Sequence, residues 1–300
     1  MIKARIPAQN KNANLASYDE TRRSFRWPDI EKEFSWYGTD RMNIITESID
    51  RWAADPKRRN LPSLIFQKAD TILSFSFAEL KAMTSKWSHM LAEHGYIAGD
   101  RLIILLPPCP EAFLVMAACA RMGVIFCPVF SSSTFYELEM RIQSTTPKGL
   151  VTLPDLAEKI SHESASQMEH ILLVNGPKPG LFANEIDIEE RISAMPDDFA
   201  PVPLPADAPL YMIYTSGSTS PPKGVIHTHA DMTGILASAR WVLDLQPSSV
   251  LWVDADPAWV TGTVYGGFAP WLCGVTSIVQ CDPFTAANWY RTLELHRVTT

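Results

Sequence analysis

The sequence lacks several features that would place it in other classes of protein. Its five cysteines include no CxxC pair and lie mostly in apolar runs, which predicts buried thiols in a reducing compartment and argues against a disulfide framework or a zinc site. The first twenty residues lack the apolar stretch of a secretory signal, and no uninterrupted apolar segment approaches membrane-spanning length. A formal net charge of −7 argues against a protein that holds nucleic acid or an anionic membrane through its overall field. These absences predict a cytoplasmic protein with neither kind of partner.

What the sequence does contain is a sizeable core: 46% of the residues are hydrophobic and 20% are charged, which is typical of a globular protein. Apolar runs predict strands at 101–107, 124–130, 149–152, 171–174, 210–214, 224–229, 250–253 and 276–279. Helical patterns fall at about 80–91, 111–122, 137–144, 231–243, 260–272 and 286–296. Alternating strands and helices of this kind predict an α/β fold in which helices cover both faces of a parallel sheet.

Three segments fall outside this alternation. Residues 1–40 are polar and then aromatic, and we interpret them as an N-terminal extension that lays aromatic side chains on the main body. Residues 178–207 are rich in prolines and acids, which predicts a surface connection with one short helix. Residues 298–300 have the composition of a strand that is just beginning. We therefore expect residues 41–300 to form an incomplete domain.

The most informative stretch is Tyr214-Thr-Ser-Gly-Ser-Thr-Ser-Pro-Pro-Lys-Gly224, between two predicted strands. Its hydroxyls and backbone N–H groups can bind phosphate oxygens, and its lysine adds a compact positive charge. An ordinary Gly/Ser/Pro linker is the alternative. A Walker A loop is excluded, because that motif needs Ser or Thr directly after Gly-Lys and opens a helix. Here Gly224 follows Lys223, and the next residues are typical of a strand.

This loop resembles the phosphate-binding signature of the adenylate-forming superfamily, Thr-Ser-Gly-Ser-Thr-Gly-x-Pro-Lys-Gly. The matching residues are Thr215, Ser216, Gly217, Ser218, Thr219, Pro222, Lys223 and Gly224. It departs from the signature at Ser220, where the family has a glycine that lets the backbone turn at little cost.

A second segment, residues 254–266, is similar to AMP-forming acetyl-CoA synthetases. Trp259, Val260, Thr261 and Gly262 match the Trp-Val-Thr-Gly that family members carry at the acyl pocket. By residue type alone, Trp259 and Val260 are more typical of core at the start of a helix than of an apolar wall for a short acyl chain. The resemblance, which spans about residues 30–300, favours the pocket.

The resemblance implies parallel and mixed sheets covered by helices, as in the large N-terminal domain of adenylate-forming enzymes. It also implies an acetate (short-chain carboxylate)–CoA ligase that uses ATP and Mg²⁺ to convert acetate or propionate into the corresponding acyl-adenylate. The acyl group then passes to coenzyme A. Thr215 and Lys223 would act in catalysis. The same two residues, with Ser216, Gly217, Ser218, Thr219 and Gly224, would bind the phosphates of ATP. The ligands of the metal stay unassigned.

Other equipment of that family, including its hinge and small C-terminal lid domain, has no counterpart in the sequence. The 300-residue chain alone is therefore expected to be inactive, and to need downstream sequence or a separate chain that carries this region. Two alternatives stay open. One is a non-catalytic, nucleotide-binding remnant, and the other is an adenylating enzyme that delivers its acyl group to a carrier protein.

Two pairs of polar residues repeat at a spacing of two. His227 and His229 could form a metal pair, but nearby Cys or His ligands are absent from the sequence, so a strand end or a loop-supporting role is favoured. Asp254 and Asp256 are predicted to be turn and capping residues, not a catalytic pair.

Overall fold

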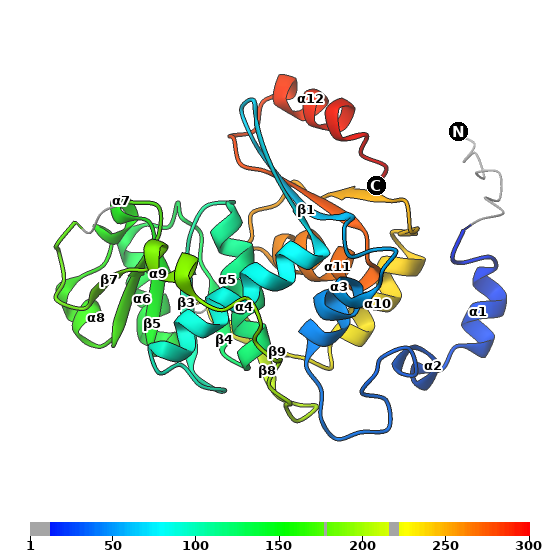
Figure 1. The fold of residues 1–300 in the computed structure, drawn as a ribbon, viewed down its shortest axis with the longest axis horizontal. Helices are drawn as coiled ribbons and strands as arrows, with labels where there is room; N and C mark the ends of the chain where they lie inside the picture. The colour runs from blue at the N-terminus through cyan, green and yellow to red at the C-terminus, as the bar shows by residue number, and fades with distance from the viewer. Residues whose placement is uncertain (1–12, 177–178, 216–221) are drawn as a thin grey trace.

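The computed structural model, which describes residues 13–176, 179–215 and 222–300, contains two β-sheets (Figure 1). The larger sheet has the order β7-β6-β5-β3-β4-β8-β9 and is parallel except for the pairing of β8 with β9. Its strands are β3 (Arg101–Leu105), β4 (Ile125–Pro128), β5 (Gly149–Thr152), β6 (His170–Leu173), β7 (Glu185–Asp187), β8 (Pro209–Thr215) and β9 (Lys223–Thr228). The smaller sheet has the order β10-β11-β1-β2, and only β1 and β2 run antiparallel. Its strands are β1 (Pro62–Lys68), β2 (Thr71–Ser76), β10 (Val250–Trp252) and β11 (Thr276–Gln280).

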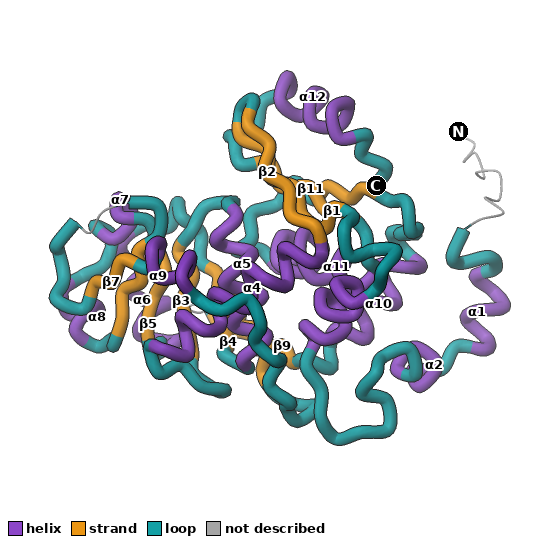
Figure 2. Tube along the Cα trace, in the orientation of Figure 1, coloured by secondary structure: helices purple, strands orange, loops and turns teal. Residues whose placement is uncertain are grey.

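Helices connect the strands and fill the space between the sheets (Figure 2). The α-helices are α1 (Tyr18–Ser24), α2 (Trp27–Glu31), α3 (Arg51–Ala54), α4 (Phe77–Glu93), α5 (Pro110–Met122), α6 (Phe135–Thr145), α7 (Pro154–Ala157), α8 (His162–Ser166), α9 (Glu189–Ala194), α10 (Met232–Trp241), α11 (Ala269–Cys273) and α12 (Ala286–His296). Two segments are π-helical: η1 (Thr46–Asp50) and η2 (Thr261–Phe268).

The centre of the larger sheet is buried on both faces, as β3 shows. Leu102 and Ile104 belong to one core cluster and Ile103 and Leu105 to another, because successive side chains of a strand point to opposite faces. The second cluster is covered by α6 and α8. The first extends to the smaller sheet through α5, where the ring of Phe113 meets that of Phe66 on β1 at 5.7 Å between centroids.

The predicted strands and helices of the sheet region are present, and the α/β fold class is confirmed. Three expectations need correction. The apolar strands predicted a parallel sheet, whereas the structure has two mixed sheets, in agreement with what the resemblance implied; the strands β1, β2 and β7 were not predicted. The helix expected over 260–272 is η2 followed by α11. Residues 298–300 form no assigned strand, yet the Thr299 N–H donates to the Val250 carbonyl and the Trp252 N–H donates to the Thr300 carbonyl, so this segment lies beside β10.

In the N-terminal segment, the stacked rings of Phe34 and Trp36 are buried, whereas Trp27 is half exposed. The proposed boundary at residue 40 stays a prediction.

Candidate active site

The strands β8 and β9 bring the two ends of the predicted phosphate loop together. Thr215 lies directly opposite Lys223, so their side chains share one face of the hairpin. Both residues are exposed. Ser216, Gly217, Ser218 and Thr219 lie outside the described residues, so the structure places only the two ends of this loop. Because Lys223 begins a strand and not a helix, the exclusion of a Walker A loop is confirmed.

Gly224 and Tyr214 lie opposite each other on the other face of the hairpin. A Cβ atom at Gly224 would lie 2.6 Å from the Sδ of Met212 and 3.4 Å from the Tyr214 ring, so the close pairing of the strands favours glycine. The Tyr214 hydroxyl lies 2.8 Å from Oγ1 of Thr145, and the Arg141 guanidinium lies 5.6 Å from the centre of its ring. The hairpin is thereby held against the end of α6.

The register of the sheet sets what lies next to Thr215. β4 and β8 are parallel and pair at Phe126 and Tyr211, so Phe130 and Thr215 each follow this pair by four residues. Both residues therefore lie at the carboxyl edge of the strands. Ligands of α/β proteins bind at this edge, where the strand order reverses, as it does here at β3 and β4.

The predicted acyl-pocket residues reach the same edge. The Trp259 ring contacts that of Phe130 edge to face, with 5.3 Å between centroids. Trp259 is 58% exposed and Val260 41% exposed, so neither is a core residue. Thr261 is exposed, whereas Gly262 is buried.

A tight turn positions these residues at the start of η2. The Asp256 carboxylate accepts a hydrogen bond from the Ala258 N–H at 2.8 Å, and its backbone carbonyl accepts one from the Trp259 N–H at 2.9 Å. Burial raises the pKa of Asp256. A Cβ atom at Gly262 would lie 2.1 Å from the Asp256 carbonyl oxygen, so only glycine fits there. Asp256 thus has the turn role predicted for it.

A cavity of about 120 Å³ lies next to Gly262. Its walls include Pro108 after β3, Trp252 at the end of β10, and Asp254 and Asp256. It is smaller than the 300–1,000 Å³ of typical sites for drug-sized ligands. Its size suits a small chemical group and not a nucleotide.

The two histidines serve different parts of the structure. His229 is buried, and its Nδ1 accepts a hydrogen bond from the Ile44 N–H at 3.1 Å. The His227 ring stacks on Tyr211 at 4.7 Å, and its Nδ1 lies 3.6 Å from the Asp231 carboxylate. His229 therefore supports the end of β9.

Residues 50–300 match a family model described as AMP-binding enzyme. The chain belongs to the AMP-binding enzyme family. The match includes the β8–β9 hairpin, Phe130 and the turn before η2, so every element of the candidate site falls within it.

Proteins similar to this AMP-binding enzyme are named as synthetases of acetyl- or acyl-coenzyme A. It is 34% identical over 290 residues to an acetyl-coenzyme A synthetase of Bacillus subtilis (strain 168), covering 96% of this chain and 50% of that protein. It is 30% identical over 293 residues to the acetyl-coenzyme A synthetase of Methylobacillus flagellatus, covering 89% of this chain and 44% of that protein. The crystal structure of an acyl-CoA synthetase from Brucella canis superposes with a TM-score of 0.85 at 27% identity, covering 94% of this chain and 51% of that one. The chain spans about half the length of the curated relatives it matches.

The structure adds two contacts of this AMP-binding enzyme that were not predicted from its sequence. They are Phe130 against Trp259, and Thr145 against Tyr214. The apolar run that ends in Phe130 predicted a strand but gave no sign of its partner. Within the described residues, no helix is long and apolar enough to cross a membrane.

Proposed function

We propose that this chain is the part of an AMP-forming carboxylate–CoA ligase that holds the triphosphate of ATP and one wall of the acyl site. The observation that carries the proposal is the shared edge of the sheet. Thr215 and Lys223, at the two ends of the phosphate loop, and the exposed Trp259 all lie there. The named relatives are synthetases of acetyl- or acyl-coenzyme A, which agrees with it.

In the first step, a carboxylate oxygen of the acid attacks the α-phosphorus of ATP, and pyrophosphate leaves with the electrons of the broken P–O bond. This reaction needs positioning and charge neutralisation more than proton transfer. Lys223, whose side chain is exposed on the same face as Thr215, supplies the positive charge, and the loop hydroxyls and N–H groups bind the β- and γ-phosphates.

In the second step, the thiolate of coenzyme A attacks the acyl carbon of the adenylate, and AMP leaves. The acid has to be short, because the nearby cavity of about 120 Å³ is small and is bounded on the Gly262 side by tightly packed backbone. Of the four matched acyl-pocket residues, Gly262 lines this cavity, while Trp259 lies beside Phe130 and supplies an exposed apolar wall with Val260. This arrangement favours acetate or propionate.

The site is compatible with Mg²⁺ that is held by the phosphates of its substrate. Within the described residues, no group of three or more His, Cys, Asp or Glu side chains is placed to hold a metal ion. Mg²⁺ commonly binds through substrate phosphates with only one or two protein ligands. Mg²⁺ would be held mainly by the phosphates of ATP, where it would neutralise their charge, and the Thr215 hydroxyl at the edge of the loop could contact it.

The test is acetate-dependent exchange of pyrophosphate into ATP. The chain is joined to the remaining half of the Bacillus subtilis relative, and the Lys223→Ala variant of the fusion is compared with Lys57→Ala, an exposed lysine on a distant loop. We expect exchange by the parent fusion, a loss of about 100-fold for Lys223→Ala and no change for Lys57→Ala.

A folded fusion that binds ATP without any exchange would contradict the ligase function and indicate a nucleotide-binding remnant. Exchange accompanied by acyl transfer to a carrier protein, and not to coenzyme A, would show that the carrier protein is the acyl acceptor. Longer acids that outcompete acetate and propionate would refute the short-chain specificity.

A further inference from the structure

We propose that the cavity between α2, residues 36–42 and the start of α10 binds a small organic cation that carries an alkylated ammonium group. The cavity has a volume of about 560 Å³, which is within the range of sites for small molecules. None of the candidate active-site residues lines it, and the proposal does not depend on the proposed function.

Three aromatic side chains form the apolar part of this cavity: Trp27, Trp36 and Tyr37. Trp27 lies against α10, since a Cβ atom at Gly234 would be 4.0 Å from its ring, and it meets Phe25 edge to face at 4.9 Å. Trp36 is fixed by its stack on Phe34, with 4.4 Å between centroids. Trp27 and Tyr37 are nevertheless 52% and 46% exposed, so these rings are held in place with surface left for a ligand.

The charged part of the cavity is negative. Glu31 and Asp231 line it, and no lysine or arginine is among its lining residues. Within the described part of the chain, the Glu31 carboxylate has no hydrogen-bond or ion-pair partner. The Asp231 carboxylate accepts a hydrogen bond from the Thr228 N–H at 2.9 Å and lies 3.6 Å from the His227 ring, yet its side chain stays half exposed.

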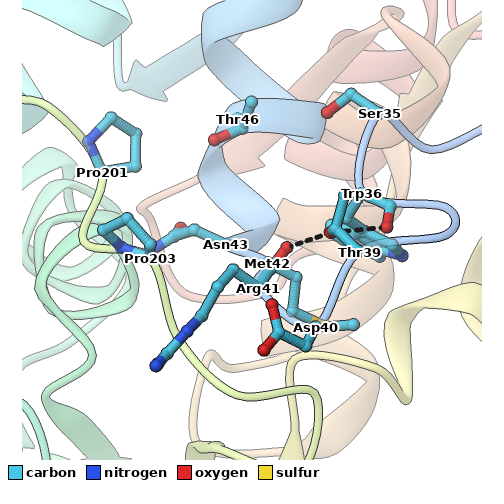
Figure 3. Close-up of a pocket in the computed structure, with 10 residues that line it drawn as sticks. All are labelled: Ser35, Trp36, Thr39, Asp40, Arg41, Met42, Asn43, Thr46, Pro201 and Pro203. Atoms are coloured by element: carbon cyan, nitrogen blue, oxygen red, sulfur yellow. Dashed lines mark hydrogen bonds between the residues drawn. The ribbon is translucent and has the colours of Figure 1, made fainter.

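Arg41 belongs to a neighbouring cavity. Trp36, Thr39 and Met42 line both cavities, and Arg41 lines only the neighbouring one. Figure 3 shows the Arg41 side chain extending away from Trp36. The carboxylates beside the aromatic rings are therefore not neutralised by a lining cation.

This combination selects for one ligand chemistry. Aromatic faces attract cations, and they do so best when the cation has apolar surface and holds its water weakly. The two carboxylates repel phosphates and other anions. A quaternary or alkylated ammonium is attracted by both the aromatic rings and the carboxylates, whereas a neutral molecule of the same shape makes only apolar contacts with the rings.

Choline and its uncharged carbon analogue, 3,3-dimethyl-1-butanol, provide the test. Binding of each to the 300-residue chain is measured by calorimetry and by tryptophan fluorescence. We expect saturable binding of choline and at least tenfold weaker binding of the alcohol. We expect Glu31→Gln and Trp27→Leu each to weaken choline binding about three- to tenfold. The exposed Glu163→Gln on α8 is the matched control and should leave it unchanged.

Equal binding of choline and the alcohol, or absence of saturable choline binding, would overturn the proposal. So would binding of a lysine-containing peptide without binding of choline, because the site would then receive a partner's side chain. Circular dichroism of each variant separates loss of the site from loss of the fold, and Glu31→Gln changes no described contact.

Discussion

Backbone atoms approach one another so closely at Gly262 that the identity of one residue controls the turn before η2. An added Cβ would meet the Asp256 carbonyl oxygen at 2.1 Å and the Ala255 carbonyl oxygen at 2.7 Å. Backbone cannot yield as a flexible side chain does, so Gly262→Ala should lower the free energy of unfolding by about 2 kcal/mol or more. Urea denaturation followed by circular dichroism measures the loss.

Gly266 is the matched control, in the same π-helix and also buried. Its added Cβ would meet only the Val253 side chain, at 3.9 Å, so Gly266→Ala should be close to neutral. Equal destabilisation by the two substitutions would show that glycine matters for the π-helix as a whole and not for the Asp256 turn.

Residue types alone favoured core positions for Trp259 and Val260, whereas the resemblance favoured the pocket. The structure decides against core, because both side chains are exposed. The place of Phe130 in the site could not be predicted from the sequence, because its contact with Trp259 depends on the pairing of β4 with β8 and on the turn at Asp256. Conversely, glycine at 262 and 224 was noted from the motifs, and the close approaches explain both.

At the scale of elements, the sequence predicted β3, β4, β5, β6 and β8 because each contains a buried apolar run. It missed β2, whose residues from Thr71 to Ser74 are all exposed and so give no such run, and β7, which has only three residues. The helix over 260–272 was predicted from apolar residues, but composition does not specify hydrogen-bond spacing. Its first part is π-helical, a form often found at functional sites.

The contact of His229 with Ile44 joins β9 to the segment before η1, and it predicts a pH dependence. Burial lowers the pKa of His229 to about 4, from an ordinary value of 6.5. Below pH 6.5 the unfolded chain binds a proton that the folded chain binds only near pH 4, so stability falls over this window. The contribution of His229 to the free energy of unfolding is fully present above pH 6.5. Its loss at lower pH amounts to at most about 3 kcal/mol.

His229→Gln retains an acceptor near the Ile44 N–H and removes the titration. Its free energy of unfolding, measured by urea denaturation at pH 7.5 and pH 5, should therefore change less than that of the parent. His162→Gln, an exposed histidine on α8, should retain the parental difference. An undiminished difference in His229→Gln would assign the pH dependence to other groups.

On the scale of the whole molecule, one buried arginine connects four distant segments. Arg121 on α5 is fully buried and forms two hydrogen bonds to the Asp50 carboxylate, at 2.7 and 2.8 Å. It also donates to the Phe199 carbonyl and to Oγ1 of Thr84. Asp50→Asn would leave this guanidinium buried without its counter-charge, which should cost about 3–5 kcal/mol of unfolding free energy.

Asp70→Asn is the control for that measurement. Asp70 pairs with Arg291 at the surface, where its side chain is 87% exposed, and such pairs contribute about 0–1 kcal/mol. Denaturation of both variants at pH 7 compares the two. A loss below 1 kcal/mol for Asp50→Asn would show that the hydrogen bonds to Thr84 and Phe199 are enough to hold the arginine.

The order of strands in the smaller sheet has a consequence for how the protein is made. β1 (62–68) pairs in parallel with β11 (276–280), so one side of the β1–β2 hairpin lacks its neighbour until about 200 further residues have been synthesised. At about 5–20 residues per second, a ribosome takes roughly 10–40 s to supply them. During that time an unpaired strand edge that includes Leu64 and Phe66 is available to other chains, as such edges promote aggregation. Newly made chains therefore need protection at this hairpin, and expression at low temperature or with chaperones should raise the soluble yield.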